Sequence, residues 1–161
     1  MTIRAARAAE LGRILEIYAD ARKFMRENGN PDQWGEGYPP EELIREDVTG
    51  GRSYVCEEDG EILGVFYYAE GNDPTYEVIA DGAWQNDAPY GVIHRIAVSA
   101  HGRGVAAACF AYAFARCGNV KIDTHENNLA MQRALAKNGF VRCGIIHLPD
   151  GSPRIAYQKC K

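Results

Sequence analysis

Residues 91–112 contain two sets of side chains whose types and spacing suit chemistry. His94 lies in an apolar, β-branched run from Gly91 to Val98, and imidazole is the side chain that gains or loses a proton near neutral pH. The run is followed by His101-Gly102-Arg103-Gly104-Val105-Ala106, with glycines two apart, and then by an alanine-rich segment. Glycines let the backbone approach a ligand closely, and the unpaired amides of a helix's first turn favour an anion. The pattern predicts strand, turn and helix, with a phosphate at the turn.

His94 has two interpretations. Alternation along a strand predicts that it shares a face with Val92, Ile96 and Val98. A histidine among apolar neighbours is often a hydrogen-bonded structural residue, and it is also the side chain best suited to accept a proton at pH 7. The sequence leaves both roles open.

The composition limits the class of protein. The 161 residues are 46% hydrophobic and 10% aromatic with a net charge of −4, which fits one globular domain over residues 1–161 and gives no overall attraction to nucleic acid. Five cysteines without CxxC pairs, no leader-like start and no apolar run near the roughly 18 residues of a membrane span predict a cytoplasmic protein that does not act at a membrane. The four histidines lack ligand spacing, so no metal is expected.

Periodicity and turn residues predict the elements that must position these residues. Helical spacing and its stop signals predict helices at 8–27, 40–48, 107–117 and 126–137, the last started by Glu126-Asn127-Asn128. Alternation and glycine-containing turns predict strands at 2–6, 53–57, 62–69, 91–98, 120–125, 140–147 and 154–160, with a short helical turn and a loop between Thr75 and Pro89. This order predicts an α/β (α+β) fold with a mixed, mostly antiparallel sheet of about seven strands, flanked on both faces by about four helices.

The loop from Asp32 to Pro40 holds two large aromatic residues among glycines and prolines. Trp34 and Tyr38 are suited to stack on a ring or a cationic amine of a substrate. They are equally suited to cover the edge of the core.

The element order and two motifs resemble the GCN5-related N-acetyltransferase (GNAT) superfamily over essentially the whole chain. The first motif is the loop 101–106, which matches the family's Arg/Gln-x-x-Gly-x-Gly/Ala pattern except that His101 replaces the usual first residue. The second is Asn128 leading into a helix that ends Lys137-Asn138-Gly139-Phe140. The resemblance implies the GNAT fold and an acetyltransferase.

The resemblance also implies a binding site for acetyl-coenzyme A (acetyl-CoA). Backbone groups near Ala97 and Val98 would pair with the pantetheine arm where the strand splays, often at a bulge. Amides from Gly102 to Ala106 would bind the pyrophosphate, with Arg103 adding charge and with a weaker side-chain contact from His101. Asn128 would contact the coenzyme or serve only as a helix cap.

Acetyl transfer to an amine needs a group that accepts the amine's proton. By resemblance to the arylalkylamine acetyltransferases, whose histidine occupies the corresponding strand position, His94 is the first candidate, with Glu70, Asp73 and His125 in reserve. Many relatives use a tyrosine as the acid that protonates the leaving thiolate, but the matching position here is Leu135. Tyr90, Tyr112 and Tyr157 are alternatives that the sequence does not rank.

Two functions of different classes remain. One is an acetyl-CoA-dependent N-acetyltransferase acting on a small molecule or on a peptide or protein amine, and the other is a non-catalytic acyl-CoA sensor, which Leu135 keeps open. Homodimers are frequent among such proteins, often through the last strands, although nothing in the sequence requires one.

Overall fold

A seven-stranded sheet forms the centre of the computed structural model, which describes all 161 residues. The strand order is β1-β2-β3-β4-β5-β7-β6, and every neighbouring pair is antiparallel except the parallel pair β4–β5. The strands are β1 (Thr2–Ala5), β2 (Ser53–Glu58), β3 (Glu61–Glu70), β4 (Gly91–Val98), β5 (Asn119–Thr124), β6 (Val141–His147) and β7 (Pro153–Cys160). The predicted mixed, mostly antiparallel sheet is therefore confirmed.

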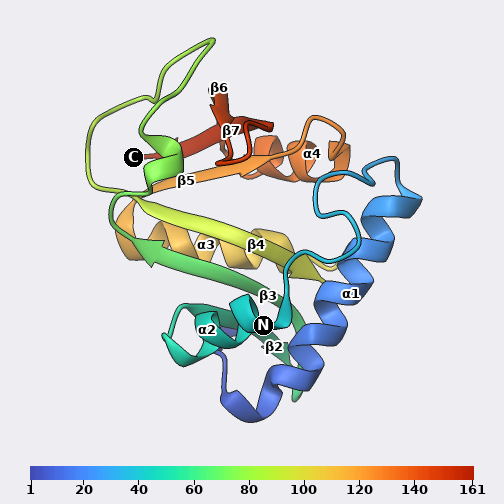
Figure 1. Cartoon of the computed structure of the whole chain (residues 1–161). Helices are drawn as coiled ribbons and strands as arrows, with labels where there is room; N and C mark the ends of the chain where they lie inside the picture. Colours follow the sequence, from blue (N-terminus) through green and yellow to red (C-terminus); the bar gives the residue numbers. More distant parts are fainter.

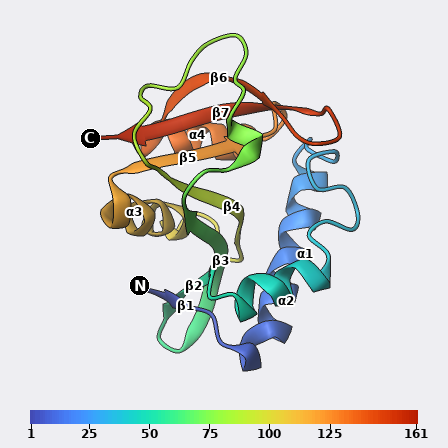
Figure 2. The ribbon, with the colours of Figure 1, turned by 60° about the vertical axis from the view of Figure 1, so that its left-hand side comes forward.

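Helices cover both faces of the sheet, as predicted. Figure 2 shows α3 on one side and α1 and α2 on the other. One apolar cluster lies beneath α3 and α4, and a second lies beneath α1 and α2. The helices are α1 (Leu11–Glu27), α2 (Glu41–Thr49), α3 (Val105–Cys117) and α4 (Leu129–Lys137), with 3₁₀ turns η1 (Ala8–Glu10) and η2 (Pro74–Tyr76). None of the helices is long and apolar enough to cross a membrane.

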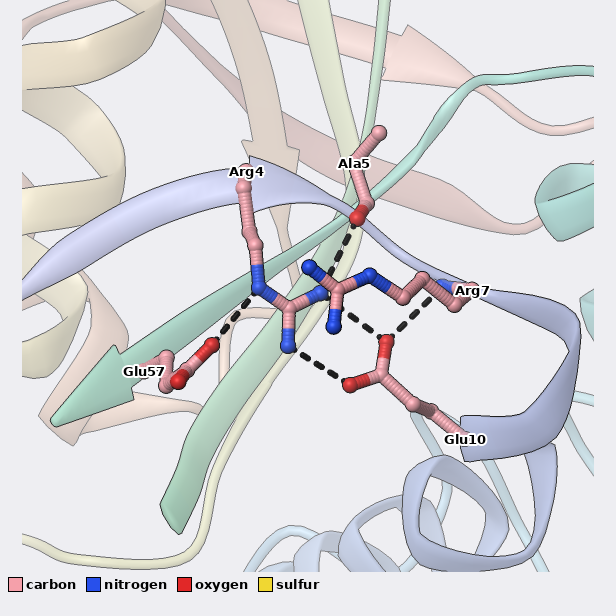
Figure 3. A network of polar contacts seen from close by, with 5 residues as sticks. All are labelled: Arg4, Ala5, Arg7, Glu10 and Glu57. Carbon is pink, nitrogen blue, oxygen red and sulfur yellow. Dashed lines mark hydrogen bonds and ion pairs between the residues drawn. The ribbon is translucent and has the colours of Figure 1, made fainter. Parts of the chain in front are cut away.

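The first helix begins later than predicted because a charged cluster fixes the chain before it (Figure 3). Arg4 on β1 donates to Glu57 on β2 at 2.6 Å and to both carboxylate oxygens of Glu10, while the Arg7 amide also donates to Glu10. The Arg4 guanidinium holds the pKa of the Glu10 carboxyl below its usual range. Residues 8–10 therefore form a 3₁₀ turn, and α1 starts at Leu11.

Strand β4 contains a bulge. Tyr67 of β3 pairs with His94 and Val65 pairs with Ala97, so β4 holds one extra residue between these two pairs. Arg95 takes up the extra length with a positive φ of 49°, and its carbonyl accepts a hydrogen bond from the hydroxyl of Tyr18 on α1 at 2.8 Å.

The bulge corrects one prediction about faces. Ile96 and Val98 pack on the α3 side, whereas Val92 and Ala97 belong to clusters on the opposite side. His94, which packs near Tyr76 of the same opposite face, shares that face with Val92 but not with Ile96 and Val98. Simple alternation fails because the extra residue shifts the side-chain pattern by one.

Strands β4 and β5 separate soon after they meet. Only Gly91 with Val120 and Val92 with Lys121 are paired, and the two strands then diverge (Figure 1). The edge of β4 that faces β5 is therefore unpaired from Ile93 onward, beside the bulge. The expected splay of this strand is present.

Candidate functional site

His94 and Asp73 form a hydrogen-bonded pair at the centre of the site. His94 Nε2 lies 2.7 Å from Asp73 Oδ2, and both side chains are partly buried. Contact with His94 is the main cause that holds the pKa of the Asp73 carboxyl below its ordinary value. Because an ionised carboxylate can only accept, Nε2–H of His94 is the donor. In the neutral imidazole, Nδ1 then keeps its lone pair, and no atom of the chain pairs with it.

The segment after β3 places Asp73 in this pair. Its Oδ1 accepts the Thr75 amide and thereby caps η2, while its own amide donates to the hydroxyl of Tyr90 at 2.9 Å. The first contact orients the carboxylate, and the second anchors the backbone of Asp73. Two of the predicted candidates for the base therefore lie together, with Asp73 as the partner of His94.

A cavity of about 680 Å³ lies in front of His94. Trp34 and Tyr38 line it together with His94, as the substrate interpretation of the loop from Asp32 to Pro40 requires. Trp34 also packs edge-on against Tyr38 and tilted against Tyr18, which is the alternative, structural role of the same side chain. The loop therefore lines the cavity and packs against the core at the same time.

The two other candidate bases lie elsewhere. Glu70 is exposed at the end of β3 and lines neither this cavity nor the smaller one described below. His125 lies outside both cavities as well, and its Nδ1 accepts the amide of Asn127. Burial, aided by the charge of Arg154, lowers the pKa of His125.

The glycine loop leads into α3 as predicted. Gly102 and Gly104 have positive φ values of 78° and 76°, which L side chains rarely adopt. The amides from Gly102 to Ala107 donate no hydrogen bond within the chain, and they lie at the positive end of the helix dipole. Such a set of free donors suits an anion.

Three side chains of the glycine loop before α3 contact three different elements. The ring of His101 stacks on Phe24 of α1 with 4.0 Å between centroids. Arg103 forms an ion pair with Glu58 of β2, so its charge is balanced by that carboxylate. Val105 is buried against β3, where Gly64 leaves room for it: a Cβ on Gly64 would come within 2.6 Å of Val105 Cγ1.

A second cavity, of about 290 Å³, lies between α1, β4 and α4. It is lined by five of the predicted coenzyme residues and their neighbours, among them Ala97, Val98, His101, Ala106 and Asn128. Asn30 also lines it, and its buried Oδ1 has no hydrogen-bond partner in the chain. An amide N–H of a ligand would satisfy this oxygen.

Asn128 has the predicted cap role. Its Oδ1 accepts the Met131 amide at the start of α4, and its Nδ2 donates to Gln33 Oε1 at 2.9 Å. Asn128 lines both cavities and therefore marks their junction.

No tyrosine stands where relatives place one. Leu135 is fully buried in the core. Tyr90, Tyr112 and Tyr157 line neither cavity, because Tyr90 lies beneath Lys121, Tyr112 packs against Tyr54, and Tyr157 is buried in β7. No group of three or more His, Cys, Asp or Glu side chains is arranged to hold a metal ion.

Sequence reasoning missed three residues of the larger cavity. Asp123 of β5 accepts a hydrogen bond from the buried hydroxyl of Tyr76 at 2.6 Å. Arg95 makes a bidentate ion pair with Asp47 of α2, with both N···O distances at 2.9 Å. Arg154 is the second residue of β7 and is only 8% exposed. In the sequence, Arg154 could have been noticed as a charged residue directly after the hairpin turn that ends at Pro153.

A sheet that splays at its fourth strand, with a glycine loop opening the next helix, defines an acetyltransferase fold. The family model of the acetyltransferase (GNAT) family matches residues 13–140, and the chain belongs to this family. A search of curated proteins returns no match. The predicted family is thus confirmed.

Solved structures agree with this assignment. A GNAT-family acetyltransferase from Streptococcus agalactiae is 34% identical, with a TM-score of 0.87 over 99% of this chain and 95% of that one. Two more distant structures show the same fold. They are the ribosomal-protein-alanine N-acetyltransferase from Brucella melitensis, at 21% identity and a TM-score of 0.64 over 100% of both chains, and AAC(6')-Ib in complex with ribostamycin and coenzyme A, at 21% identity and 0.65 over 99% and 93%.

Proposed function

We propose that the protein transfers an acetyl group from acetyl-CoA directly to an amine, with His94 as the general base. The observation that supports this most is the His94–Asp73 pair facing the larger cavity beside the β4 bulge. Nε2 of His94 is engaged by Asp73, whereas Nδ1 has no partner in the chain and is available to accept a proton. Asp73 holds the ring and favours the tautomer that leaves Nδ1 as acceptor.

The residues present fit the coenzyme. The free amides from Gly102 to Ala107 suit its pyrophosphate, and the unpaired edge of β4 near Ala97 suits the amides of its pantetheine arm. The orphaned Asn30 Oδ1 offers one more acceptor in the smaller cavity. When bound, acetyl-CoA supplies the acetyl group as a thioester.

The chain's own part in the reaction is to hold the amine and move its proton. The amine nitrogen forms the new bond to the acetyl carbon while the bond from that carbon to sulfur breaks. His94 Nδ1 accepts the proton that the nitrogen loses and releases it to solvent, and the departing thiolate takes up one proton from solvent. Because residue 135 is a leucine, whose side chain has no acidic proton, the thiolate's proton does not come from that position.

The test is a single substitution with a matched control. His94→Ala is expected to lower kcat by about 100-fold or more, the usual contribution of a general base, while calorimetry shows coenzyme affinity within about twofold of the parent. His147→Ala, which removes an exposed histidine at the end of β6, is expected to leave both unchanged.

Two outcomes would contradict this proposal. A His94→Ala protein with full activity would remove His94 as base. Tight acetyl-CoA binding with no thiol release over a broad panel of amines would indicate the non-catalytic sensor instead.

A further inference from the structure

Arg154 is a buried cation without a counter-ion. Its residue is only 8% exposed, and it makes no ion pair with any carboxylate. Its two hydrogen bonds go to backbone carbonyls, from Nη1 to Pro153 at 2.9 Å and from Nη2 to Gln33 at 3.3 Å. A guanidinium has five N–H donors, so several remain without an acceptor in the chain. Buried charges are normally paired, because desolvation of an isolated one is costly.

The free donors of Arg154 belong to the larger cavity, which Arg154 lines together with His94. Both side chains lie on the same side of the sheet. Ile155 pairs with Thr124 and packs in the cluster beneath α3 and α4, so its neighbour Arg154 points to the opposite face. His94 occupies that opposite face as well, beside Tyr76. One ligand in this cavity can therefore meet the base with one end and the guanidinium with the other.

Acidic residues of the cavity do not neutralise Arg154. Asp123 is engaged by the Tyr76 hydroxyl. Asp150 lies in the exposed hairpin turn, where the Ser152 contacts lower the pKa of its carboxyl and the charge of Arg154 adds a smaller effect, yet no ion pair forms between them. Asp32 lies in the loop from Asp32 to Pro40 and forms no ion pair. These carboxylates suit an arriving ammonium group, whereas the free donors of Arg154 suit an anion.

The position of Arg154 is fixed before any ligand arrives. The carbonyl of Gln33 that it contacts belongs to a residue whose side chain accepts hydrogen bonds from Asn30 and from Asn128, the cap of α4. The guanidinium is thus held between β7 and the loop from Asp32 to Pro40, and its remaining donors are available to a carboxylate, which a guanidinium can bind bidentately.

Resting on the proposed function, we infer that the acceptor is an amine that also bears a carboxylate, an amino acid in the broad sense, and that Arg154 binds this carboxylate while His94 faces the amine. A polyamine or a simple alkylamine would leave the guanidinium unpaired. The residue is a specificity determinant and takes no part in proton transfer.

The test compares matched acceptors with the full-length protein and acetyl-CoA, following thiol release. Each amino acid is paired with the amine that lacks only its carboxylate: 4-aminobutyrate with propylamine, 6-aminohexanoate with pentylamine, phenylalanine with phenethylamine, and lysine with cadaverine. For the pair with the best acceptor, kcat/KM is expected to be roughly 100-fold higher for the amino acid, since a charged hydrogen-bonded pair contributes about 1.5–3 kcal/mol and 1.4 kcal/mol is a tenfold change.

Substitution then assigns the preference to Arg154. Arg154→Gln is expected to abolish the roughly 100-fold preference, chiefly by raising KM for the amino acid. Arg154→Lys is expected to retain only part of the preference. Lysine keeps the positive charge but lacks the planar guanidinium that can bind a carboxylate through two N–H groups. Arg142→Gln, which alters an exposed arginine on β6, serves as the control and is expected to behave as the parent.

The outcomes separate this inference from the proposed function. Coenzyme binding by each variant, measured by calorimetry, shows that it is folded. Acetylation of amines with no preference for the carboxylate, or a preference that survives Arg154→Gln, would overturn the inference and leave the acetyltransferase standing. Absence of thiol release with every amine tested would overturn both.

Discussion

At the scale of residues, the site depends on one contact between segments far apart in the chain. Asp73 follows β3 and His94 lies in β4, and the bond between them sets which nitrogen of the imidazole is free. The same bond changes how the fold responds to acid. A carboxyl whose pKa is lower in the folded chain stabilises the fold above its unfolded pKa, and this contribution disappears as the pH falls through the folded value.

Asp73→Asn is therefore expected to destabilise the protein at pH 5 and to have a smaller effect at pH 3. At the higher pH the parent has the full contribution of the ionised carboxylate, and at the lower pH this contribution is being lost. Urea unfolding of both proteins at the two pH values measures the difference. Asp20→Asn, at an exposed position of α1, is the control, and a gap between parent and Asp73→Asn that grows toward pH 3 would contradict the expectation.

At the scale of elements, the backbone of the loop before α3 performs the binding that we propose. Gly104 has a φ of 76° and precedes the free amides. Gly51 has a comparable φ of 71° beyond the end of α2, and nothing lies within 4 Å of a Cβ at either position. The two glycines share conformation and space but differ in their distance from the coenzyme site.

Gly104→Glu is expected to abolish acetyl-CoA binding, because it places bulk and negative charge at the pyrophosphate position. Gly51→Glu has the same backbone strain and is expected to bind the coenzyme as the parent does. Calorimetric titration with acetyl-CoA measures both. Unchanged affinity in Gly104→Glu would remove the loop from the coenzyme site.

The seating of α3 on the sheet gives a second prediction at this scale. Gly64→Ala would bring a Cβ within 2.6 Å of Val105 Cγ1 and 3.3 Å of the Ala97 carbonyl oxygen. We expect a loss of about 1–3 kcal/mol in the free energy of unfolding and weaker coenzyme binding, since α3 and the β4 edge are both displaced. Gly12→Ala in α1, where nothing lies within 4 Å of the new Cβ, is expected to be neutral or stabilising by up to about 1 kcal/mol. Urea unfolding of the two variants distinguishes these effects, and equal stability would contradict them.

At the scale of the whole molecule, the sheet consists of two parts with a narrow join. Strands β1 to β4 form one part and β5 to β7 the other, and β4 and β5 share only the pairs Gly91–Val120 and Val92–Lys121. Figure 1 shows the divergence beyond these pairs. A ligand that bridges both parts binds only the folded chain and so stabilises the whole of it.

Acetyl-CoA at about 100 times its Kd is accordingly expected to raise stability by about 2.7 kcal/mol, or Tm by roughly 5–10 °C for a chain of this size. Differential scanning calorimetry with and without the coenzyme measures the shift. Gly104→Glu should show none, and a parent protein with no shift would argue against the coenzyme site.

The element order and the two motifs could be predicted from the sequence, because periodicity, glycines and helix caps such as Asn128 are local signals. The bulge could not, since the residue that absorbs it is Arg95 and not a glycine, and only pairing with β3 reveals it. Arg154 was missed for a similar reason. Whether Arg154 has a carboxylate partner depends on residues from several elements that line the cavity, and the residues next to Arg154 in the sequence do not indicate it.

The extra residue at Arg95 also has a consequence for how β4 tolerates insertions and deletions. A regular strand would place His94 and Ala97, three positions apart, on opposite faces, and the bulge places them on the same one. Deleting Arg95 would place Ala97 two positions after His94, so the two residues would still share a face, but the bulge, the hydrogen bond from Tyr18 to the Arg95 carbonyl and the ion pair with Asp47 would be lost. A β4 strand shortened at this point would therefore keep His94 on its face of the sheet and lose the contacts that join the bulge to α1 and α2.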